Sequence, residues 1–355
     1  MRIAIDARLV LGSSTGDSAY WTGLLEGFAK LAPDANFLFI SNAAEPLGIP
    51  SHLKFEWITV RSKSSRYWSM VSLPLAARRA RADLLHVQYN LSPLVGRRGV
   101  TTIHDVSFFV GPEWFKPSDL QVLRRFVPAS ARRAAAVLTV SDTSKSEIIR
   151  YIPAADGKTF ATPLATPVHI ERCSPPEAAA LLQPFDIGEP FLLTVGTRWP
   201  RKNVRLAIDA ANLAGRRLLV TGKAGWGKET LGEHAKTTGY LDSRTLSALY
   251  SSAALYLAPS FHEGFGLPVL EAFKCGCPVM CSEGGALPEV AGDAAQVVKS
   301  WDAEVWADQI KRLLAASSNL ESLRNKGFER ERKFSWERTA ALTMDAYRWA
   351  LGKAN

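Results

Sequence analysis

Short apolar runs alternate along this chain with longer stretches in which apolar residues recur every three or four positions. Runs this hydrophobic, separated by helical patterns, indicate parallel strands that helices cover on both faces. The strand-like runs span residues 2–6, 36–41, 54–60, 83–88, 100–104 and 136–141 in the first half, and 190–196, 217–222, 254–260, 278–282 and 294–298 in the second half. We therefore predict an α/β protein built on doubly wound parallel sheets.

The strand series pauses between residues 163 and 190, where six prolines occur. A proline-rich pause is typical of the connection between two α/β units, and 355 residues suit two domains better than one core. We predict a Rossmann-like domain over residues 1–168, a linker over 169–188, a second Rossmann-like domain over 189–335 and an amphipathic helix over 336–355. Ligands of such sheets bind at the carboxyl ends of the strands, so function is sought in the loops there.

The loop after the third run of the second half reads FHEGFGLPVLEAFKCG, residues 261–276. Gly264 and Gly266 allow the backbone to approach a ligand closely, and the proline that follows suits the first turn of a helix. Free amides and the positive dipole at a helix start favour a phosphate or a developing anion. Glu263 precedes this anion site and Glu271 lies about one turn into the helix, where carboxylates can accept hydrogen bonds from sugar hydroxyls. One solvated and one capping glutamate would be the ordinary alternative.

The loop after the first run of the second half carries three cations within five residues. Gly196 ends the run, and Arg198, Arg201 and Lys202 follow it. Arginine makes fork-shaped contacts to phosphate oxygens, and lysine supplies a point charge. A solvated basic loop is the alternative, but the position at the carboxyl end of a strand favours a ligand phosphate.

Two loops of the first half carry weaker signals. His104 ends one strand-like run, where it either donates to a substrate hydroxyl or carbonyl or is a packed core histidine. Asp105 can orient this loop, contact an acceptor or cap a turn. Gly12 and Gly16 flank small hydroxyl residues in a loop that can pass under a phosphate, although ordinary turn glycines fit as well. The spacing is not GxGxxG, and no acidic residue closes the second run, which counts against a nicotinamide site.

The formal net charge of +9 is concentrated in one region, because residues 54–133 hold 14 Lys or Arg against five Asp or Glu. Such a face attracts polyanions, although a solubilising face without a partner is the alternative. Residues 62–83 interleave Tyr67, Trp68 and Met70 with basic residues, which suits an anionic membrane surface. The alternative is a helix that buries Trp68 and exposes its arginines.

Cysteine usage and hydropathy indicate the compartment. The four cysteines show no CxxC spacing and no nearby histidine cluster, so we expect reduced thiols and no metal site. No stretch approaches the roughly 20 apolar residues that span a bilayer, and the start MRIAIDARLV is too soon charged for a secretory signal. We predict a cytoplasmic protein, with its basic first domain as a candidate for peripheral attachment to the inner face of the membrane.

Several sequence blocks, in the correct order, resemble the glycosyl transferases group 1 family, the retaining, nucleotide-sugar-dependent glycosyltransferases of the GT-B fold. The blocks are TIHDVSF (102–108), VLTVSDTSKSEII (137–149), VGTRWPRKN (195–203), GYLDSRTLSALYSSAALYLAPS (239–260), EGFGLPVLEAFKCGCPV (263–279) and GGALPEVAGDAA (284–295). The most specific block is 263–279, with two glutamates separated by seven residues. The resemblance implies an acceptor-binding first domain and a donor-binding second domain that face a central cleft, and a final helix that packs back on the first domain.

The resemblance also implies roles by position. Arg201 and Lys202 are similar to the pair that holds the donor diphosphate, and Arg198 assists them. Glu271 resembles the glutamate that binds the nucleotide ribose. Glu263 resembles the one that faces the donor sugar and supports its positive charge in the transition state.

Further donor contacts are implied for the neighbouring loops and for the first domain. Backbone groups that bind the sugar, the phosphates or the base are implied at Gly196, Gly239, Tyr240, Leu241, Gly264, Phe265, Gly266 and Leu267. His104 resembles the histidine that reaches the sugar ring, so the implied catalytic set is His104, Glu263, Arg201 and Lys202. In the first loop, Ser18 and Ala19 stand where relatives often carry glycine and arginine, so we expect the acceptor to differ from that of close relatives.

The resemblance predicts a hexosyltransferase that moves a hexose from a nucleotide-sugar donor to a hydroxyl of a glycan or lipid-linked acceptor in cell-surface polysaccharide synthesis. The anomeric configuration is retained by same-face attack, with the donor phosphate accepting the acceptor proton. Cations and oriented amides stabilise the leaving diphosphate, so no metal or cofactor is expected, in keeping with the lack of a DxD-type pair at a strand end.

The donor and the class of protein keep alternatives. GDP-mannose is the first candidate donor, because relatives with the HDVSF-type block are often mannosyltransferases, and UDP-hexoses follow. A nucleotide-sugar epimerase of the same fold and a nucleotide-binding oxidoreductase are the alternative enzymes. A nucleic-acid-binding protein would explain the basic face but not the two glutamates, so no nucleic acid partner is expected.

Overall fold

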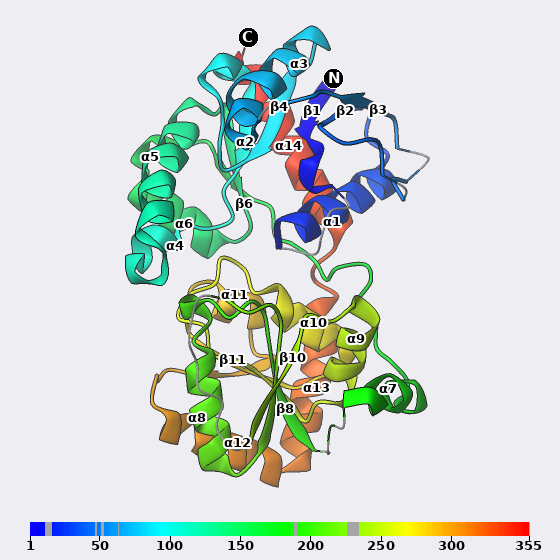
Figure 1. Cartoon of the computed structure of the whole chain (residues 1–355), viewed down its shortest axis with the longest axis vertical. Coiled ribbons are helices and arrows are strands. Elements are labelled where there is room, and N and C mark those ends of the chain that lie inside the picture. Colours follow the sequence, from blue (N-terminus) through cyan, green and yellow to red (C-terminus); the bar gives the residue numbers. More distant parts are fainter. Residues whose placement is uncertain are drawn as a thin grey trace. The chain divides into compact units, whose positions relative to one another are not determined.

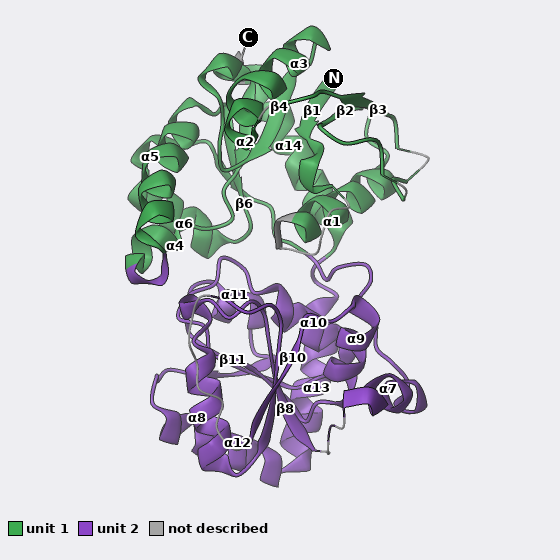
Figure 2. Ribbon diagram, in the orientation of Figure 1, with its two compact units in different colours: residues 1–112, 116–164, 335–355 green, residues 113–115, 165–334 purple. Residues whose placement is uncertain are grey.

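The computed structural model describes residues 1–10, 16–46, 48–50, 53–62, 64–185, 187, 190–225 and 234–354 (Figure 1). The chain forms two compact units (Figure 2). Unit 1 consists of Met1–Pro112, Lys116–Leu164 and Ser335–Asn355, and unit 2 consists of Glu113–Phe115 and Ala165–Phe334. Each unit is built on one parallel sheet, so the α/β pattern read from the apolar runs is confirmed.

The sheet of unit 1 has the strand order β3-β2-β1-β4-β5-β6-β7, and all of its pairings are parallel. Its strands are β1 (Arg2–Asp6), β2 (Asn36–Ser41), β3 (Phe55–Thr59), β4 (Leu84–Gln88), β5 (Gly99–Thr102), β6 (Ala136–Thr139) and β7 (Thr159–Ala161). The helices of this unit are α1 (Gly16–Leu31), α2 (Ser65–Tyr67), α3 (Leu73–Arg79), α4 (Ser107–Val110), α5 (Pro117–Arg133), α6 (Asp142–Tyr151) and α14 (Trp336–Ala354), with a π-helical turn at Trp68–Ser72. Short 3-10 turns lie at Ala7–Leu9, Pro93–Arg98, Pro112–Trp114 and Pro153–Ala155.

The final helix, α14, belongs to unit 1 and packs tightly against α1. Gly23 and Gly27 lie one turn apart on α1 and make room for Trp336: a Cβ on Gly23 would lie 2.0 Å from its indole ring, and one on Gly27 would lie 2.1 Å from its carbonyl oxygen. Trp336 is 4% exposed. The two glycines therefore allow the helices to approach more closely than alanines would.

A buried polar chain links α14 to the sheet of unit 1. The Tyr347 hydroxyl lies 2.6 Å from His86 Nδ1, and His86 Nε2 lies 2.7 Å from Thr102 Oγ1. The Tyr20 hydroxyl of α1 lies 2.9 Å from the same Thr102 oxygen. Burial lowers the pKa of His86 to about 3, so the imidazole is neutral in the folded chain.

Trp68 lies in the core of unit 1 and is not available to a membrane. It is 1% exposed, its Nε1 donates to Asp6 Oδ1 at 3.2 Å, and the Arg8 guanidinium lies 5.2 Å from its ring centroid. The hypothesis of Trp68 as a lipid anchor is therefore wrong. Its neighbour Tyr67 is exposed, as are Leu75, Arg78 and Arg79 of α3.

The sheet of unit 2 has the strand order β10-β9-β8-β11-β12-β13, again with parallel pairings. Its strands are β8 (Phe191–Val195), β9 (Arg217–Thr221), β10 (Ala235–Gly239), β11 (Leu255–Ala258), β12 (Val279–Ser282) and β13 (Ala295–Val298). Its helices are α7 (Pro175–Leu182), α8 (Val204–Ala214), α9 (Ser243–Ser252), α10 (Leu267–Cys275), α11 (Leu287–Ala291), α12 (Ala303–Ala315) and α13 (Ser317–Glu331). Further 3-10 turns lie at Gln183–Phe185 and Pro200–Lys202.

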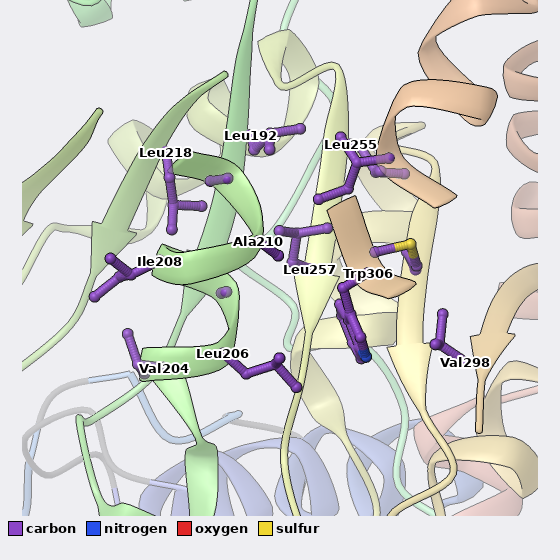
Figure 3. Close-up of a cluster of buried hydrophobic side chains, with 14 of the residues drawn as sticks. Leu192, Val204, Leu206, Ile208, Ala210, Leu218, Leu255, Leu257, Val298 and Trp306 are labelled. Carbon is purple, nitrogen blue, oxygen red and sulfur yellow. The ribbon is translucent and has the colours of Figure 1, made fainter. Parts of the chain in front are cut away.

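A hydrophobic cluster joins the sheet of unit 2 to α8 and α12 (Figure 3). Leu192, Leu218 and Leu257 come from three neighbouring strands and meet Ile208 of α8 and Trp306 of α12, all at most 1% exposed. Fully burying such a side chain contributes about 1.5–3 kcal/mol. This core holds the strands from whose ends the loops with Arg201, Lys202 and Glu263 arise.

Three elements differ from the sequence reading. The strands β7 and β10 were not predicted, because β7 has three residues and β10, AKTTG, is a partly exposed edge strand with no apolar run. The segment 169–188 is not a plain linker: it contains α7, which packs against α9 within unit 2. Prolines 175 and 176 start this helix instead of breaking it, because proline fits the first helical turn.

Candidate active site

The predicted site residues of unit 2 gather where β8 and β11 lie side by side. These strands are neighbours in the sheet although β9 and β10 separate them in sequence, so the chain connections leave them in opposite directions. In open α/β sheets such a point is where ligands bind. The loops that follow the two strands are joined directly, since Phe261 N donates to Arg201 O at 2.8 Å and Arg201 Nη1 donates to His262 O at 2.6 Å.

Glu263 is the centre of an ion-pair cluster. Its Oε1 accepts from Lys202 Nζ at 2.6 Å and from Ser260 Oγ at 2.5 Å, and its Oε2 accepts from Arg201 Nη1 at 2.8 Å. The side chains of Glu263, Lys202 and Arg201 are 10%, 17% and 19% exposed. Burial alone would raise the pKa of Glu263, but the charges of Lys202 and Arg201 outweigh it and hold that pKa well below its usual range. The three residues predicted to act on the donor are thus brought together, and Ser260 joins them.

The backbone around Glu263 is held by the turn after β12. Ala286 N donates to Glu263 O at 2.9 Å, and Ser282 Oγ donates to Ser260 O at 2.6 Å. At Gly285, with φ of +61°, a Cβ would lie 2.3 Å from the Glu263 carbonyl oxygen, so the turn cannot carry a side chain there. The sequence block 284–295 resembles the family, but the sequence assigned it no role. The structure shows that its first residues pack against the Glu263 backbone.

Helix α10 begins directly after this cluster. Gly266 is its N-cap, with φ of +105°, and Pro268 lies in its first turn, as the sequence predicted. Glu271 Oε2 accepts from the Tyr250 hydroxyl of α9 at 2.9 Å. Burial raises the pKa of Glu271, and the Tyr250 hydrogen bond and the charge of Lys202 partly offset this rise. The two glutamates therefore have opposite pKa shifts, and Tyr250 is a partner that sequence reasoning missed.

The remaining donor candidates line the same edge of the sheet. The Lys202 stem crosses Gly196, whose φ is +137° and whose added Cβ would lie 3.4 Å from Lys202 Cε. Arg198 N donates to Lys223 O at 3.2 Å. At the end of β10, Tyr240 is 53% exposed and the Lys223 ammonium lies 5.2 Å from its ring centroid. The described ends of β8, β9 and β10 therefore bring the candidates 196, 198 and 239–241 to one side of Glu263.

The predicted site residues His104 and Asp105 belong to unit 1. His104 Nε2 lies 3.2 Å from Gln88 Nε2, and its ring packs edge-on against Tyr20 with 5.1 Å between centroids. Asp105 Oδ1 accepts from both the amide and the hydroxyl of Ser107, at 2.8 and 2.5 Å. Asp105 therefore caps a turn, which was one of the alternatives for this residue. Gly16 begins α1, and Gly12 lies outside the described residues.

The geometry of unit 2 supplies the parts of an anion and hydroxyl site. Two cations and the start of α10 can stabilise negative charge, while two carboxylates with different environments can accept hydrogen bonds from hydroxyls. Within the described residues, no group of three or more His, Cys, Asp or Glu side chains is placed to hold a metal ion.

Comparison with known proteins identifies the family. The model of "Glycosyl transferases group 1" matches residues 183–330, and that of "Glycosyltransferase Family 4" matches residues 39–163. Over 267 residues the chain is 34% identical to O-antigen chain mannosyltransferase B of Escherichia coli, which covers 71% of this chain and 70% of that protein. The chain belongs to the glycosyl transferases group 1 family.

Other relatives agree with this membership of the group 1 glycosyltransferases. D-inositol 3-phosphate glycosyltransferase of Segniliparus rotundus is 30% identical over 300 residues, covering 76% of this chain and 67% of that protein. The structure of sucrose-phosphate synthase from Thermosynechococcus elongatus superposes with a TM-score of 0.76 over 100% of both chains at 22% identity, which shows the shared GT-B fold. The resemblance read from the sequence blocks is confirmed, and this group 1 glycosyltransferase is an enzyme that transfers glycosyl groups.

Proposed function

We propose that this glycosyltransferase moves a hexose from a nucleoside diphosphate to a hydroxyl of a glycan or lipid-linked acceptor, with retention at the anomeric carbon. The observation that carries the proposal is the Arg201–Lys202–Glu263 cluster beside the start of α10. A diphosphate leaving group develops negative charge, and cations and oriented amides are the groups that stabilise it.

The proposed donor complex follows from exchanging partners in this cluster. Lys202 and Arg201 turn from Glu263 to the diphosphate oxygens, and the amides of residues 264–267 face the same charge. Glu263 then accepts from sugar hydroxyls and stabilises the positive charge of the sugar in the transition state. Glu271 accepts from the ribose hydroxyls. No protein side chain is assigned as general base, because the donor phosphate oxygen can take the acceptor proton on the face from which the diphosphate leaves.

The backbone of residues 239–241 is proposed to read the base, and Arg198 to support the diphosphate. In unit 1, His104 is proposed as a contact of the sugar ring, and residues 12–16 with Asp105 as an acceptor loop. GDP-mannose is the proposed first donor, supported by the similarity to an O-antigen chain mannosyltransferase. A mannose-containing surface polysaccharide is accordingly the proposed product.

Transfer assays test this function directly. GDP-mannose, UDP-glucose and UDP-GlcNAc are each incubated with α-mannobiose as acceptor probe, with and without EDTA, and the product linkage is read by NMR. We expect one donor to yield an α-linked trisaccharide whose formation EDTA does not reduce. A β-linked product would contradict retention, loss of activity with EDTA would contradict metal independence, and nucleoside diphosphate release from UDP-GlcNAc without acceptor would favour an epimerase.

We also propose that unit 1 attaches to an anionic membrane surface through α3. Its exposed residues Leu75, Arg78 and Arg79 place one apolar group beside two cations, with Tyr67 exposed nearby in the sequence. None of the described helices is both long and apolar enough to cross a bilayer. The protein should co-sediment with phosphatidylglycerol vesicles and less with phosphatidylcholine vesicles, and Arg78→Gln with Arg79→Gln should weaken this binding. Equal binding to both vesicle types would refute the attachment.

A further inference from the structure

Three aromatic side chains of unit 2 gather at the loop that carries Glu263. The rings of Trp114 and Phe261 are parallel within 3°, with 5.9 Å between their centroids. The ring of Trp301 lies 4.9 Å from that of Phe261 at an angle of 55°. Phe261 precedes the ion-pair cluster by two residues, so this aromatic cluster is continuous with the candidate active site.

The strand order places Trp301 on the side of the sheet opposite the loop proposed to read the base. The base is assigned to the loop after β10 and the two diphosphate cations to the loop after β8, on one side of β11, whereas Glu271 and the amides of residues 264–267 follow β11 itself. Phe261 follows β11 and Trp301 follows β13, the last strand on the other side of the sheet. A group that binds beside Trp301 would therefore lie away from the base.

The exposure of Trp301 distinguishes it from a core tryptophan. Trp306, five residues later, is 0% exposed and its Nε1 donates to Ser300 O at 2.7 Å. Trp301 is 44% exposed, and the rings of Trp114 and Phe261 are half-buried. An open aromatic surface with a polar tip is suited to a ligand that has both a flat apolar face and hydroxyl groups.

The charges around Trp301 select among such ligands. Asp302 follows it directly and Glu304 and Asp308 are exposed on α12, whereas one base, Lys299, is exposed two residues before it, so acidic groups outnumber basic ones there. These carboxylates would repel a phospholipid headgroup or another polyanion, and they accept hydrogen bonds from neutral hydroxyls. A pyranose ring combines an apolar C–H face with such hydroxyls.

We propose that Trp114, Phe261 and Trp301 form an acceptor subsite that stacks on a sugar ring of the acceptor glycan. This rests on the proposed transferase function, and it adds residues of the donor-binding unit to acceptor recognition. The subsite sets acceptor affinity and not nucleotide affinity, since no nucleotide contact is assigned to these three rings, although the Phe261 backbone donates to Arg201 O.

The test compares Trp301→Ala and Trp301→Phe with wild type at saturating donor and varied α-mannobiose. Trp301→Ala should raise the acceptor KM roughly threefold to tenfold, the range expected for losing one aromatic contact. Its kcat and its affinity for GDP and UDP should stay within twofold, and Trp301→Phe should recover part of the loss. The matched control is Leu213→Ala, a 50% exposed apolar residue at the far end of α8, which should leave the acceptor KM unchanged.

Calorimetric titration of α-mannotriose and maltotriose into the protein without donor separates this subsite from the transferase function. Binding by wild type that weakens in Trp301→Ala supports the subsite even where no donor supports transfer. The subsite would be overturned by an acceptor KM that Trp301→Ala leaves unchanged, or by wild-type protein that binds neither trisaccharide. An equal loss of GDP or UDP affinity in Trp301→Ala would also overturn it, because that loss would show a structural role.

Discussion

Glu263→Gln tests the balance of charge in the candidate active site. The substitution removes one negative charge while it keeps the size of the side chain and one acceptor oxygen. In the structure, Lys202 and Arg201 both donate to this carboxylate, at 2.6 and 2.8 Å, and both cations are less than one fifth exposed. Removing one partner of a buried ion pair costs about 3–5 kcal/mol, because the remaining charge stays desolvated. For a unit the size of unit 2, this corresponds to a fall in Tm of about 10 °C.

The same substitution should have the opposite effect on nucleotide binding. A nucleoside diphosphate must compete with Glu263 for Lys202 and Arg201, and a hydrogen bond to a charged group contributes about 1.5–3 kcal/mol. Without this competitor, GDP or UDP should bind roughly tenfold more tightly. Turnover should nevertheless fall, because the carboxylate proposed to stabilise the positive sugar is gone.

Scanning fluorimetry and calorimetric titration of GDP and UDP at pH 7.5 measure both effects. The control is Glu283→Gln, an exposed glutamate after β12, which should change Tm by less than about 1 °C. The folded-state pKa of Glu263 is held below its unfolded value of 4.5, so its stabilisation is complete above that pH and is lost as the pH falls further. The Tm gap between wild type and Glu263→Gln should therefore narrow below pH 4.5. Weaker binding of both nucleotides by Glu263→Gln, or an unchanged Tm, would refute the reasoning.

Three further predictions follow from the packing and the buried groups. Gly27→Ala should lower the Tm of unit 1, because the added Cβ would lie 2.1 Å from a carbonyl oxygen of α14. In the control Gly352→Ala, the added Cβ meets open space, so the free energy of unfolding should rise by up to about 1 kcal/mol. Equal Tm shifts of the two variants in scanning fluorimetry would contradict this packing. Burial lowers the pKa of His86 to about 3, so the contribution of the neutral imidazole to stability is complete above pH 6.5. As the pH falls below 6.5, the free energy of unfolding should decrease by up to about 1.4 kcal/mol per pH unit. Urea unfolding between pH 7 and 4 should show this decrease for wild type and not for His86→Gln. Tyr250→Phe removes a hydrogen bond that lowers the pKa of Glu271, so Glu271 should become protonated at a higher pH. The pH below which GDP or UDP binding weakens should therefore move upward. An unchanged pH dependence of binding would show that Glu271 does not contact the nucleotide.

The sequence was most informative where burial and local chemistry coincide. Central strands such as β8 and β11 are buried on both faces, so their apolar runs were recognised, whereas the polar edge strand β10 was not. The loop glycines and the proline of α10 predicted a helix start beside Glu263 because their backbone requirements are local. By contrast, the helical pattern left two positions open for Trp68, a lipid surface or the protein core. Only the folded structure shows that Trp68 lies in the core, where its Nε1 donates to Asp6 on β1.

The sequence by itself determined the fold class, the family and the residue types of the candidate site, since each depends on periodicity or on short motifs within one loop. Only the tertiary structure decided which of these residues meet. Glu263 finds Lys202 and Arg201 because β8 and β11 are neighbours in the sheet, and it finds Ser260 because the loop bends back on itself. The aromatic cluster of Trp114, Phe261 and Trp301 joins three distant segments. Hydrophobic periodicity reports which face of an element is buried, but strand order sets which loops lie together, and short-range contacts between charges and rings depend on that order.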